Sequence, residues 1–312
     1  MNNKNQIKRF SYYFFNALGL FVPNVIFRRL LKRNLNKLSC ENQGYIKSRV
    51  DYYNKLSVVN LDIKFEHCVA SYKKTKGTTY YFDMRNVIKY FPSSFKFSMI
   101  AGDVTCIPNS PSFVKSRPIN GHNENSVLLK LNKIRHFNFI KDEIPYKDKK
   151  NMSVWRGVGY QPHRVQVLKQ FYAHKMCNIG QTKPYRGNPW EKEFMCINEQ
   201  LQYKFLLCIE GNDVATNLKW VMSSNSLCMM SKPKFETWFM EGRLEAGVHY
   251  VELKGDYSDL IEKMNYYLAN EDKALQIINN ANQYVEQFKD EKREKLIELL
   301  VAQKYFERSG QL

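Results

Sequence analysis

The sequence contains no Cys-x-x-Cys pair, no internal repeat and no low-complexity tract. Its seven cysteines are scattered along the chain, and several lie inside apolar runs. An odd, unpatterned number of cysteines in a chain of this length predicts reduced thiols rather than a disulfide framework or a zinc site. We therefore assign these cysteines no chemistry and expect those inside apolar runs to pack as small apolar side chains.

A convincing membrane span is also lacking, although residues 10–27 are nearly as apolar as one. Asn16, Gly19, Pro23 and Asn24 interrupt this stretch, and no small-residue cleavage site follows it. Basic residues flank it on both sides, namely Lys4, Lys8, Arg9, Arg28, Arg29, Lys32, Arg33 and Lys37. Two interpretations stay open: the segment lies on an anionic membrane surface, or its apolar face packs on the first domain.

Acidic residues are scarce beside basic ones, since 30 Asp and Glu against 48 Lys and Arg give a formal net charge of +18. This excess implies an anionic partner, which is nucleic acid, an acidic membrane surface or a phosphorylated substrate, and charge alone does not choose among them. No RNP-type motif for RNA binding is visible. The high aromatic content, 20 Tyr and 20 Phe, argues against disorder, and 312 residues suffice for two domains.

The charged run at residues 141–150, which contains Pro145, marks the predicted domain boundary. In the first domain, residues 78–82 and 95–100 have the composition of β-strands. We expect four parts: a basic, apolar N-terminal segment 1–40, a first domain 41–150, a second domain 151–289 and a C-terminal helix 290–312.

The second domain alternates strand and helix patterns, which predicts an α/β fold with a mostly parallel sheet. Strands are predicted at residues 205–209, 227–230 and 248–253, and helices at 165–172, 214–223, 258–268 and 271–288. In the last of these helices, the spacing of Leu275, Ile278, Ala281 and Val285 predicts one buried face.

Residues 203–222 are the most informative segment of the chain. An apolar run is followed by a Gly-Asn-Asp turn at Gly211 and then by a predicted helix. This arrangement places backbone N–H groups at a helix N-terminus, where they bind phosphate. Because every α/β protein contains such turns, the segment gains weight only together with the sequence around it.

That surrounding sequence resembles glycosyltransferase family 90. The similarity covers residues 154–157 (Val-Trp-Arg-Gly) with Arg164, the stretch from 203 to 263, and more loosely residues 101–105, so it spans roughly residues 80–290. The family includes protein O-glucosyltransferases, fungal capsule-associated xylosyltransferases and bacterial lipopolysaccharide core transferases. In its length and basic character, the chain looks most like the bacterial group.

The resemblance implies an α/β fold of GT-B type, in which two Rossmann-like domains face each other across a cleft. Residues 41–150 would bind the acceptor and residues 151–289 the donor, UDP-glucose or UDP-galactose. The implied reaction is inverting hexose transfer to the lipopolysaccharide core, by a cytoplasmic protein peripheral on the anionic inner-membrane surface, with no nucleic acid as partner. The alternative is a basic, non-enzymatic module that binds RNA or a membrane.

The resemblance assigns nine residues to donor binding: Arg156, Gly157, Arg164, Gly211, Asp213, Thr216, Asn217, Lys219 and Glu236. Guanidinium groups suit this role because they bind phosphate oxygens bidentately. Asn217 stands where the family commonly has Arg, so either Lys219 supplies the charge or the diphosphate contact differs here. Asp213 is equally suited to cap a helix, and Glu236, predicted on a helix, either binds sugar hydroxyls or only complements the helix dipole.

On the acceptor side, Asp103 follows an apolar strand and matches the family position that acts as general base for the acceptor hydroxyl. Lys115 and Arg117, on a predicted loop, are candidates for binding a phosphorylated or carboxylated acceptor. The chain contains no Asp-x-Asp motif. We therefore expect no metal and no cofactor, with side chains and helix termini compensating the charge of the leaving group.

Overall fold

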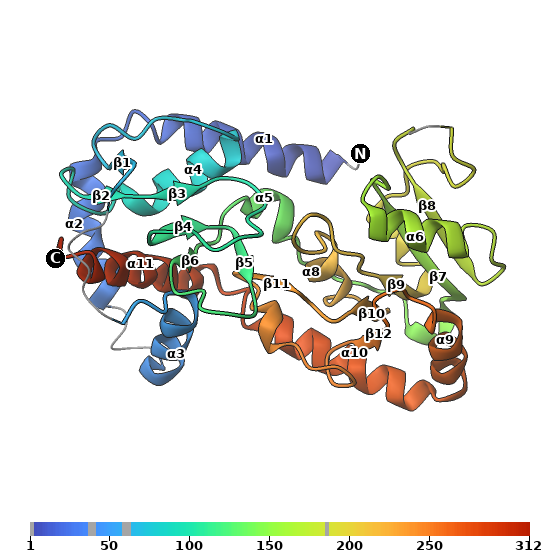
Figure 1. Cartoon of the computed structure of the whole chain (residues 1–312). Coiled ribbons are helices and arrows are strands. Elements are labelled where there is room, and N and C mark those ends of the chain that lie inside the picture. Colours follow the sequence, from blue (N-terminus) through green and yellow to red (C-terminus); the bar gives the residue numbers. More distant parts are fainter. Residues whose placement is uncertain (1–2, 37–41, 58–63, 185–186) are drawn as a thin grey trace. The chain divides into compact units, whose positions relative to one another are not determined.

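The computed structural model describes residues 3–36, 42–57, 64–184 and 187–312 (Figure 1). Lys37 and Cys40 lie outside these residues. The described chain mixes helices with parallel and antiparallel strands, and its main sheet is parallel, so the predicted α/β class is confirmed.

The chain divides into two compact units. The first, the parallel-sheet unit, contains His136–Pro233 and Glu241–Lys289. The second, the terminal unit, contains the described residues from Asn3 up to Arg135, together with Lys234–Met240 and Asp290–Leu312.

The division falls at residue 136 rather than at the expected residue 150, because the intervening segment packs with the parallel-sheet unit. Tyr146 lies in the hydrophobic core of that unit. Asp142 accepts a hydrogen bond from the Lys149 ammonium at 2.8 Å and another from the backbone amide of Asn225 at 2.9 Å. The charged run thus supplies one buried ion pair, Lys149 with Asp142, and packs with this unit.

Five parallel strands form the sheet of the parallel-sheet unit, in the order β12-β10-β9-β7-β8. The strands are β7 Lys150–Gly157, β8 Cys177–Gln181, β9 Tyr203–Leu207, β10 Leu227–Ser231 and β12 Val251–Leu253. Every residue of β9 is buried, as expected for a central strand of a parallel sheet covered on both faces. The predicted strands are present, displaced by two or three residues at β9 and β12.

The strand order contains one reversal. Numbered along the chain, the strands lie in the spatial order 2-1-3-4-5, because the chain passes from β7 outward to β8 and then returns to place β9 on the other side of β7. The point between β7 and β9 is therefore the topological switch point of the sheet. Open α/β sheets bind ligands at this point, beyond the carboxyl ends of the strands.

Three long helices cover the sheet and match the predicted ones: α6 Pro162–Phe171, α9 Leu260–Ala269 and α10 Glu271–Glu286. Helix α6 packs on β8, α9 contacts β7 and β12, and α10 contacts β10 (Figure 1). The buried face of α10 includes Ile278, Ala281 and Val285 as predicted. Leu275 is an exception, since it is 45% exposed and Ala274 occupies the buried position instead.

The helix predicted at residues 214–223 is largely absent. Only α8, Leu218–Val221, is helical in this stretch. Before it, Val214 and Ala215 are buried in an irregular turn, and the Gly211 amide donates to the Val214 carbonyl at 3.3 Å. The four-residue spacing of Val214, Leu218 and Met222 predicted a helical face, but these side chains are buried although residues 214–217 form a turn. The short helices α5 Lys133–His136 and α7 Ile197–Gln200, with the 3₁₀ turns Tyr146–Asp148 and Glu241–Arg243, complete the connections.

The terminal unit is built around a small parallel sheet, β3-β4-β6. Its strands are β3 Met99–Ile100, β4 Ser112–Val114 and β6 Ser126–Leu128. Two antiparallel pairs flank it: β1 His67–Cys68 with β2 Lys96–Phe97, and β5 Ser116–Pro118 with β11 Phe235–Thr237. The predicted strand at 95–100 is thus confirmed as β2 and β3.

Five helices complete the terminal unit: α1 Asn3–Leu18, α2 Asn24–Leu35, α3 Gln43–Tyr53, α4 Thr78–Ile88 and α11 Glu291–Arg308. Helix α11, the predicted C-terminal helix, packs against α2, α3 and α4 (Figure 1). Residues 78–82, predicted as a strand, form the first turns of α4. Burial of Tyr80, Met84 and Val87 on one helical side overrides the strand propensity of the aromatic run.

The interrupted apolar segment near the N-terminus forms α1 and α2 instead of one continuous helix. Its break falls at residues 19–23, where Gly19 and Pro23 were expected to interrupt it. Within the described residues, no helix combines the length and the apolar character needed to cross a bilayer. The expectation that this segment is not a span is consistent with that finding.

The cysteines that the structure describes are free thiols, as predicted, and three of them are buried like small apolar side chains. Cys68, Cys106 and Cys196 are partly or fully exposed free thiols, and Cys177 is a buried one. The sulfurs of the two remaining buried thiols, at positions 208 and 228, lie 3.7 Å apart on neighbouring strands and are not joined. Burial raises the pKa of the Cys177 thiol, so it stays protonated and apolar.

A buried carboxylate holds the terminal unit together, and its removal tests the packing. Glu294, 2% exposed, pairs with Arg49 at 2.8 Å and accepts from the Trp238 indole at 2.5 Å. Glu294→Ala leaves the Arg49 charge buried without this partner, so we expect the free energy of unfolding to fall by about 3–5 kcal/mol in urea titrations.

The matched control is Glu286→Ala, which removes the exposed i,i+3 pair with Lys289 and should cost less than about 1 kcal/mol. Equal losses of unfolding free energy in the two variants would show that the buried contacts of Glu294 with Arg49 and Trp238 do not stabilise the terminal unit.

Candidate active site

Arg164, in α6, ties together the two loops at the switch point of the sheet. Its Nε donates to the carbonyl oxygen of Glu210 at 2.8 Å, and its Nη1 and Nη2 donate to the carbonyls of Val158 and Ile209, each at 2.9 Å. Val158 follows β7, whereas Ile209 and Glu210 follow β9. The guanidinium also lies 5.3 Å from the ring centre of Trp155. A permanently charged group is thereby fixed beyond the carboxyl ends of two adjacent strands.

Two glycines shape the same region. A Cβ on Gly157 would lie 2.5 Å from Cζ2 of Trp155, a distance that real Cβ contacts do not reach, so only glycine fits the end of β7. A Cβ on Gly211 would lie 3.5 Å from Nη2 of Arg164, which is an ordinary van der Waals distance. Packing within the chain therefore requires Gly157 but does not by itself require Gly211.

Arg156 is engaged on the other side of β7, toward β8. Its Nη1 and Nη2 donate to the carbonyl and the Oδ1 of Asn178, both at 2.7 Å, and its Nε donates to the carbonyl of Glu193 at 3.1 Å. Burial lowers the pKa of this guanidinium, and the neighbouring Tyr203 and Glu199 partly oppose that effect. Arg156 thus joins β7 to the β8 side, whereas Arg164 joins the loops after β7 and β9.

Besides Gly211, the turn after β9 carries three further predicted donor residues, Asp213, Thr216 and Asn217. Asp213 is buried, and Thr216 is half-buried. Asn217 donates its amide to the carbonyl of Leu207, the last residue of β9, at 2.8 Å. Because the predicted helix does not begin at residue 214, the expected helix N-terminus is replaced by an irregular turn beside the switch point.

Lys219, the second candidate for charge compensation, is fully buried. Its ammonium lies 2.6 Å from a carboxylate oxygen of Glu241, which is 1% exposed, and 5.9 Å from the ring centre of Phe137. An ion pair at this depth compensates both charges within the parallel-sheet unit. The prediction that Lys219 contacts a diphosphate remains a prediction, and the ion pair gives this residue a structural role.

In the terminal unit, Asp103 and Lys115 form an ion pair of 2.5 Å between Oδ1 and Nζ. Both follow strands of the parallel sheet: Asp103 comes shortly after β3, and Lys115 directly after the neighbouring β4. The carboxyl ends of parallel strands share one edge of a sheet, which explains why these two side chains meet. The side chain of Lys115 is 2% exposed, whereas that of Asp103 is 33% exposed, so the carboxylate faces solvent.

The backbone around Asp103 is anchored on both sides. Gly102 adopts φ +116°, a conformation that L side chains rarely adopt. After it, the amide of Val104 donates to Oγ of Ser116 at 3.0 Å, and the Ser116 hydroxyl donates back to the Val104 carbonyl at 3.2 Å. The carboxylate therefore projects from a turn held in place by β5.

Arg117 and Glu236, predicted to bind different substrates, bind each other. Arg117 lies opposite Glu236 in the β5–β11 pair, and its Nε donates to Glu236 Oε1 at 2.7 Å. The hydroxyl of Tyr52 donates to the other carboxylate oxygen. Arg117 also donates to backbone carbonyls, including that of Ser126 at 3.0 Å. Both side chains are almost completely buried.

This placement corrects two structural expectations. Residues 114–119 are not a solvated loop, because β4 and β5 run through them and Lys115 and Arg117 are buried. Glu236 is on strand β11 of the terminal unit and not on a helix of the predicted donor domain. Its segment pairs with β5 across a long sequence separation, which the local pattern does not reveal.

The structure thus brings the predicted residues together in two groups. In the parallel-sheet unit, Arg164, Gly211 and Gly157 gather at the ends of β7 and β9. In the terminal unit, Asp103 meets Lys115, and Arg117 meets Glu236. The partners that sequence reasoning missed, Tyr52 and Glu241 among them, gave no signal because they lie far from their contacts along the chain.

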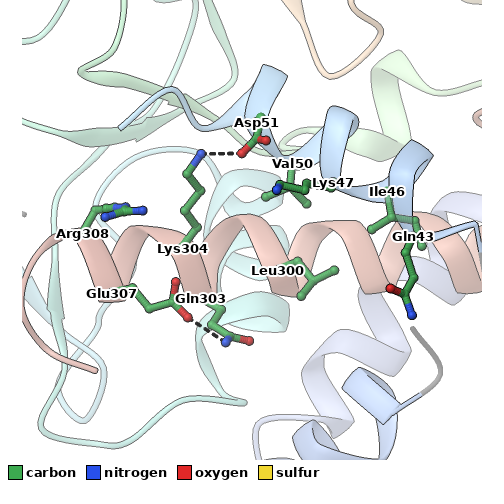
Figure 2. A pocket seen from close by; sticks show the side chains of 10 residues that line it. All are labelled: Gln43, Ile46, Lys47, Val50, Asp51, Leu300, Gln303, Lys304, Glu307 and Arg308. Carbon is green, nitrogen blue, oxygen red and sulfur yellow. Dashed lines mark hydrogen bonds and ion pairs between the residues drawn. The ribbon is translucent and has the colours of Figure 1, made fainter. Parts of the chain in front are cut away.

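A groove of about 360 Å³ lies between α3 and α11 in the terminal unit (Figure 2). Figure 2 shows charged side chains of both signs along it, with the Lys304 ammonium bonded to Asp51 at 2.7 Å. Gln303 donates to Glu307 at 2.8 Å on the same helix. None of the predicted site residues lines this groove.

Among the residues that the structure describes, no group of three His, Cys, Asp or Glu side chains is placed to hold a metal ion. The expectation that the reaction needs no metal remains a prediction, since it rests on the missing Asp-x-Asp motif.

Comparison with known proteins identifies relatives across most of the chain. Residues 127–296 match the sequence profile described as glycosyl transferase family 90. A protein named O-glucosyltransferase LpsA, from Dichelobacter nodosus, is 46% identical over 267 residues, which cover 85% of this chain and 84% of that protein. Protein O-glucosyltransferase 3 from Homo sapiens is 25% identical over 170 residues, 52% of this chain and 33% of the human protein.

The contacts of Arg164 predict a local effect of its removal. Arg164→Ala deletes three hydrogen bonds that join the loops after β7 and β9, so amide hydrogen exchange should accelerate in residues 157–161 and 209–213. Mass spectrometry of the exchanged peptides measures this change.

Arg156→Ala is the control, since it loses contacts to Asn178 and Glu193 and should affect the peptides around those residues instead. Unchanged exchange in both switch-point loops of the Arg164 variant would show that this side chain does not hold them.

Proposed function

The chain belongs to glycosyl transferase family 90 and is a glycosyltransferase, and from that premise we propose that it transfers a hexose from a UDP-sugar to a lipopolysaccharide core acceptor. The observation that carries the proposal is the position of Arg164 and Gly211 at the switch point between β7 and β9. The non-enzymatic alternative, a basic binding module, is not retained because family and relative both indicate a transferase.

The donor is assigned to the parallel-sheet unit. A UDP-sugar presents a pyrophosphate, and the turn at Gly211 together with the Arg164 guanidinium lies where ligands of open α/β sheets bind. Because Lys219 is paired with Glu241, we assign the charge compensation to guanidinium groups, Arg164 first and Arg156 second. Thr216 and the backbone around Asp213 are further candidates for phosphate contacts.

Glucose is the first sugar to test. The 46% identical relative carries the name O-glucosyltransferase, and galactose differs from glucose in one hydroxyl configuration only. An active site distinguishes such epimers through individual hydrogen bonds to the hydroxyl groups. UDP-glucose and UDP-galactose are therefore compared side by side in the proposed assay.

The acceptor and the base are assigned to the terminal unit. We assign Asp103 as the general base that takes the proton from the acceptor hydroxyl during a single inverting displacement. Its partly exposed carboxylate and its fixed turn support this assignment. Lys115 then holds the carboxylate in place and does not bind the acceptor directly, and Arg117 and Glu236 maintain the strand pair beside it.

This proposal includes a GT-B arrangement. The parallel-sheet unit binds the donor, the terminal unit binds the acceptor, and transfer takes place when both substrates are bound. It also includes a peripheral position at the cytoplasmic face of the inner membrane, where a lipid-linked core acceptor is available. The high positive charge of the chain supports a negatively charged acceptor and surface.

Asp103→Asn tests the assignment of the base. The amide is nearly isosteric with the carboxylate but cannot accept the proton, so transfer should fall by about 10²- to 10⁴-fold while UDP binding stays unchanged. Sugar transfer to a purified core oligosaccharide and calorimetric titration with UDP measure the two quantities.

Asp256→Asn, in an exposed turn of the parallel-sheet unit, is the matched control and should retain full activity. Undiminished transfer by the Asp103 variant would remove that residue from the mechanism.

Treatment with EDTA tests the charge compensation. If guanidinium groups stabilise the departing UDP, the transfer rate should stay within about twofold of the untreated enzyme, because no cation has to bridge the pyrophosphate. A loss of activity that is restored only by added manganese would contradict this part of the proposal.

A further inference from the structure

An exposed apolar surface lies on the two N-terminal helices. Of the sixteen large apolar side chains that are exposed in the described residues, nine fall between residues 7 and 26. Six of them define what we term the N-terminal apolar surface: Ile7, Phe10, Phe14, Phe15, Leu18 and Phe21. Phe21 is 86% exposed and Phe10 is 70% exposed. Folded proteins rarely expose so many large apolar groups together without a binding partner.

Helix α1 contacts the rest of the terminal unit through the side that carries Tyr12 and Asn16. The Tyr12 hydroxyl donates to Asp83 Oδ1 at 2.7 Å, and the Asn86 amide donates to Asn16 Oδ1 at 2.5 Å. The Tyr12 and Tyr13 rings also pack against Phe82, with centroids 6.4 Å away in each case. These contacts fix which side of α1 faces the protein.

Helical periodicity places the apolar residues on the other side. Ile7, Phe10, Phe14 and Leu18 follow one another at spacings of three and four residues, which line one face of a helix. On a helical wheel of 3.6 residues per turn, this face lies opposite the one that carries Tyr12. The aromatic side chains are therefore exposed because of how α1 is attached and not because the helix is loose.

Helix α2 is attached in the same manner. Phe27 packs against Tyr90, with ring centroids 5.5 Å apart, and Arg28 donates to the Ser93 hydroxyl at 3.1 Å. Its other side carries Val25 and Ile26, which are 44% and 47% exposed. The two helices thus present apolar groups to solvent on both sides of the break between them.

Charge decides among the possible partners. None of the first 40 residues is acidic and eight are basic. Where the structure describes their side chains, Arg9, Arg29 and Arg33 are exposed, whereas those of Lys4 and Lys32 are outside the description. A second copy of the chain would bring these like charges together, which is unfavourable. An anionic lipid surface offers both an apolar layer and negative headgroups.

We propose that the N-terminal apolar surface inserts into the acyl boundary of an anionic bilayer, with Arg29 and Arg33, which share the exposed side of α2 with Val25 and Ile26, at the headgroups. The 16 residues of α1 are fewer than the roughly 20 that span a bilayer, so the helix lies along the interface. This inference deepens the membrane placement of the proposed function and rests on it, but lipid binding is measured without any sugar transfer.

Flotation of the full chain with lipid vesicles tests the proposal. The chain should float with vesicles of phosphatidylethanolamine and phosphatidylglycerol, and at least about tenfold less should float with phosphatidylcholine alone. Replacing Phe10, Phe14, Phe15 and Phe21 by Ser should lower binding to the anionic vesicles by about tenfold or more. Replacing Arg29 and Arg33 by Gln should have a similar effect, most visible at low salt.

The matched control replaces Phe194 and Leu275 by Ser, since both are exposed elsewhere on the chain at 67% and 45%. This control should bind vesicles as the unmodified chain does. All variants should keep UDP binding and transfer to a water-soluble core oligosaccharide, so a failure of membrane binding is distinguished from a failure of the enzymatic proposal.

A measurement on the unmodified chain guards against misfolded variants. Amide hydrogen exchange in residues 7–26 should slow on addition of the anionic vesicles, with little change in the parallel-sheet unit. Absence of flotation with anionic vesicles, equal flotation of the Phe variant, or a dimer that the Phe variant abolishes would each overturn the proposal.

Discussion

The attachment of Arg164 to the ends of two neighbouring strands is the interaction on which the proposed chemistry depends. The direction in which successive strands are added to the sheet reverses at β7: β8 lies on one side of it and β9 on the other. The loops that leave β7 and β9 therefore diverge at this point. One guanidinium joins them through carbonyl groups of Val158, Ile209 and Glu210. The cation is thereby fixed before a substrate arrives, and charge that is already oriented stabilises a leaving group without the cost of reorganisation.

Several cations of the chain are buried beside carboxylates. Arg49 with Glu294, Arg117 with Glu236 and Lys219 with Glu241 are all buried pairs within single units. Such pairs add modestly to stability but make the loss of either partner expensive. The cations left on the surface are then available for anionic partners. Asp103 differs from the other carboxylates because its lysine is buried while the carboxylate itself is partly exposed.

The sequence predicted the elements with regular patterns and missed those that depend on distant contacts. The parallel sheet and the helices α6, α9, α10 and α11 were predicted from alternating strand and helix periods. The helix expected after Gly211 was wrong because Val214 and Ala215 are buried in a turn, where their spacing imitates a helical face. Local spacing does not distinguish these two causes of burial.

The parts of the candidate site that lie in local sequence patterns were predictable, and the parts that depend on distant contacts were not. Arg164 and Gly211 were placed together by a family resemblance and a strand-turn pattern, and in the structure Nη2 of Arg164 lies 3.5 Å from the position that a Cβ on Gly211 would occupy. The pairing of Arg117 with Glu236 joins strands 119 residues apart, and no motif in either segment indicates it. Burial of Lys115 and Lys219 likewise depends on partners that tertiary packing supplies.

A crystal structure of the enzyme with UDP tests the central claim most directly. We expect the pyrophosphate beyond the carboxyl ends of β7 and β9, within hydrogen-bonding distance of Arg164 or of the backbone around Gly211. UDP bound with its pyrophosphate remote from both would contradict the assignment of the switch point as the donor site.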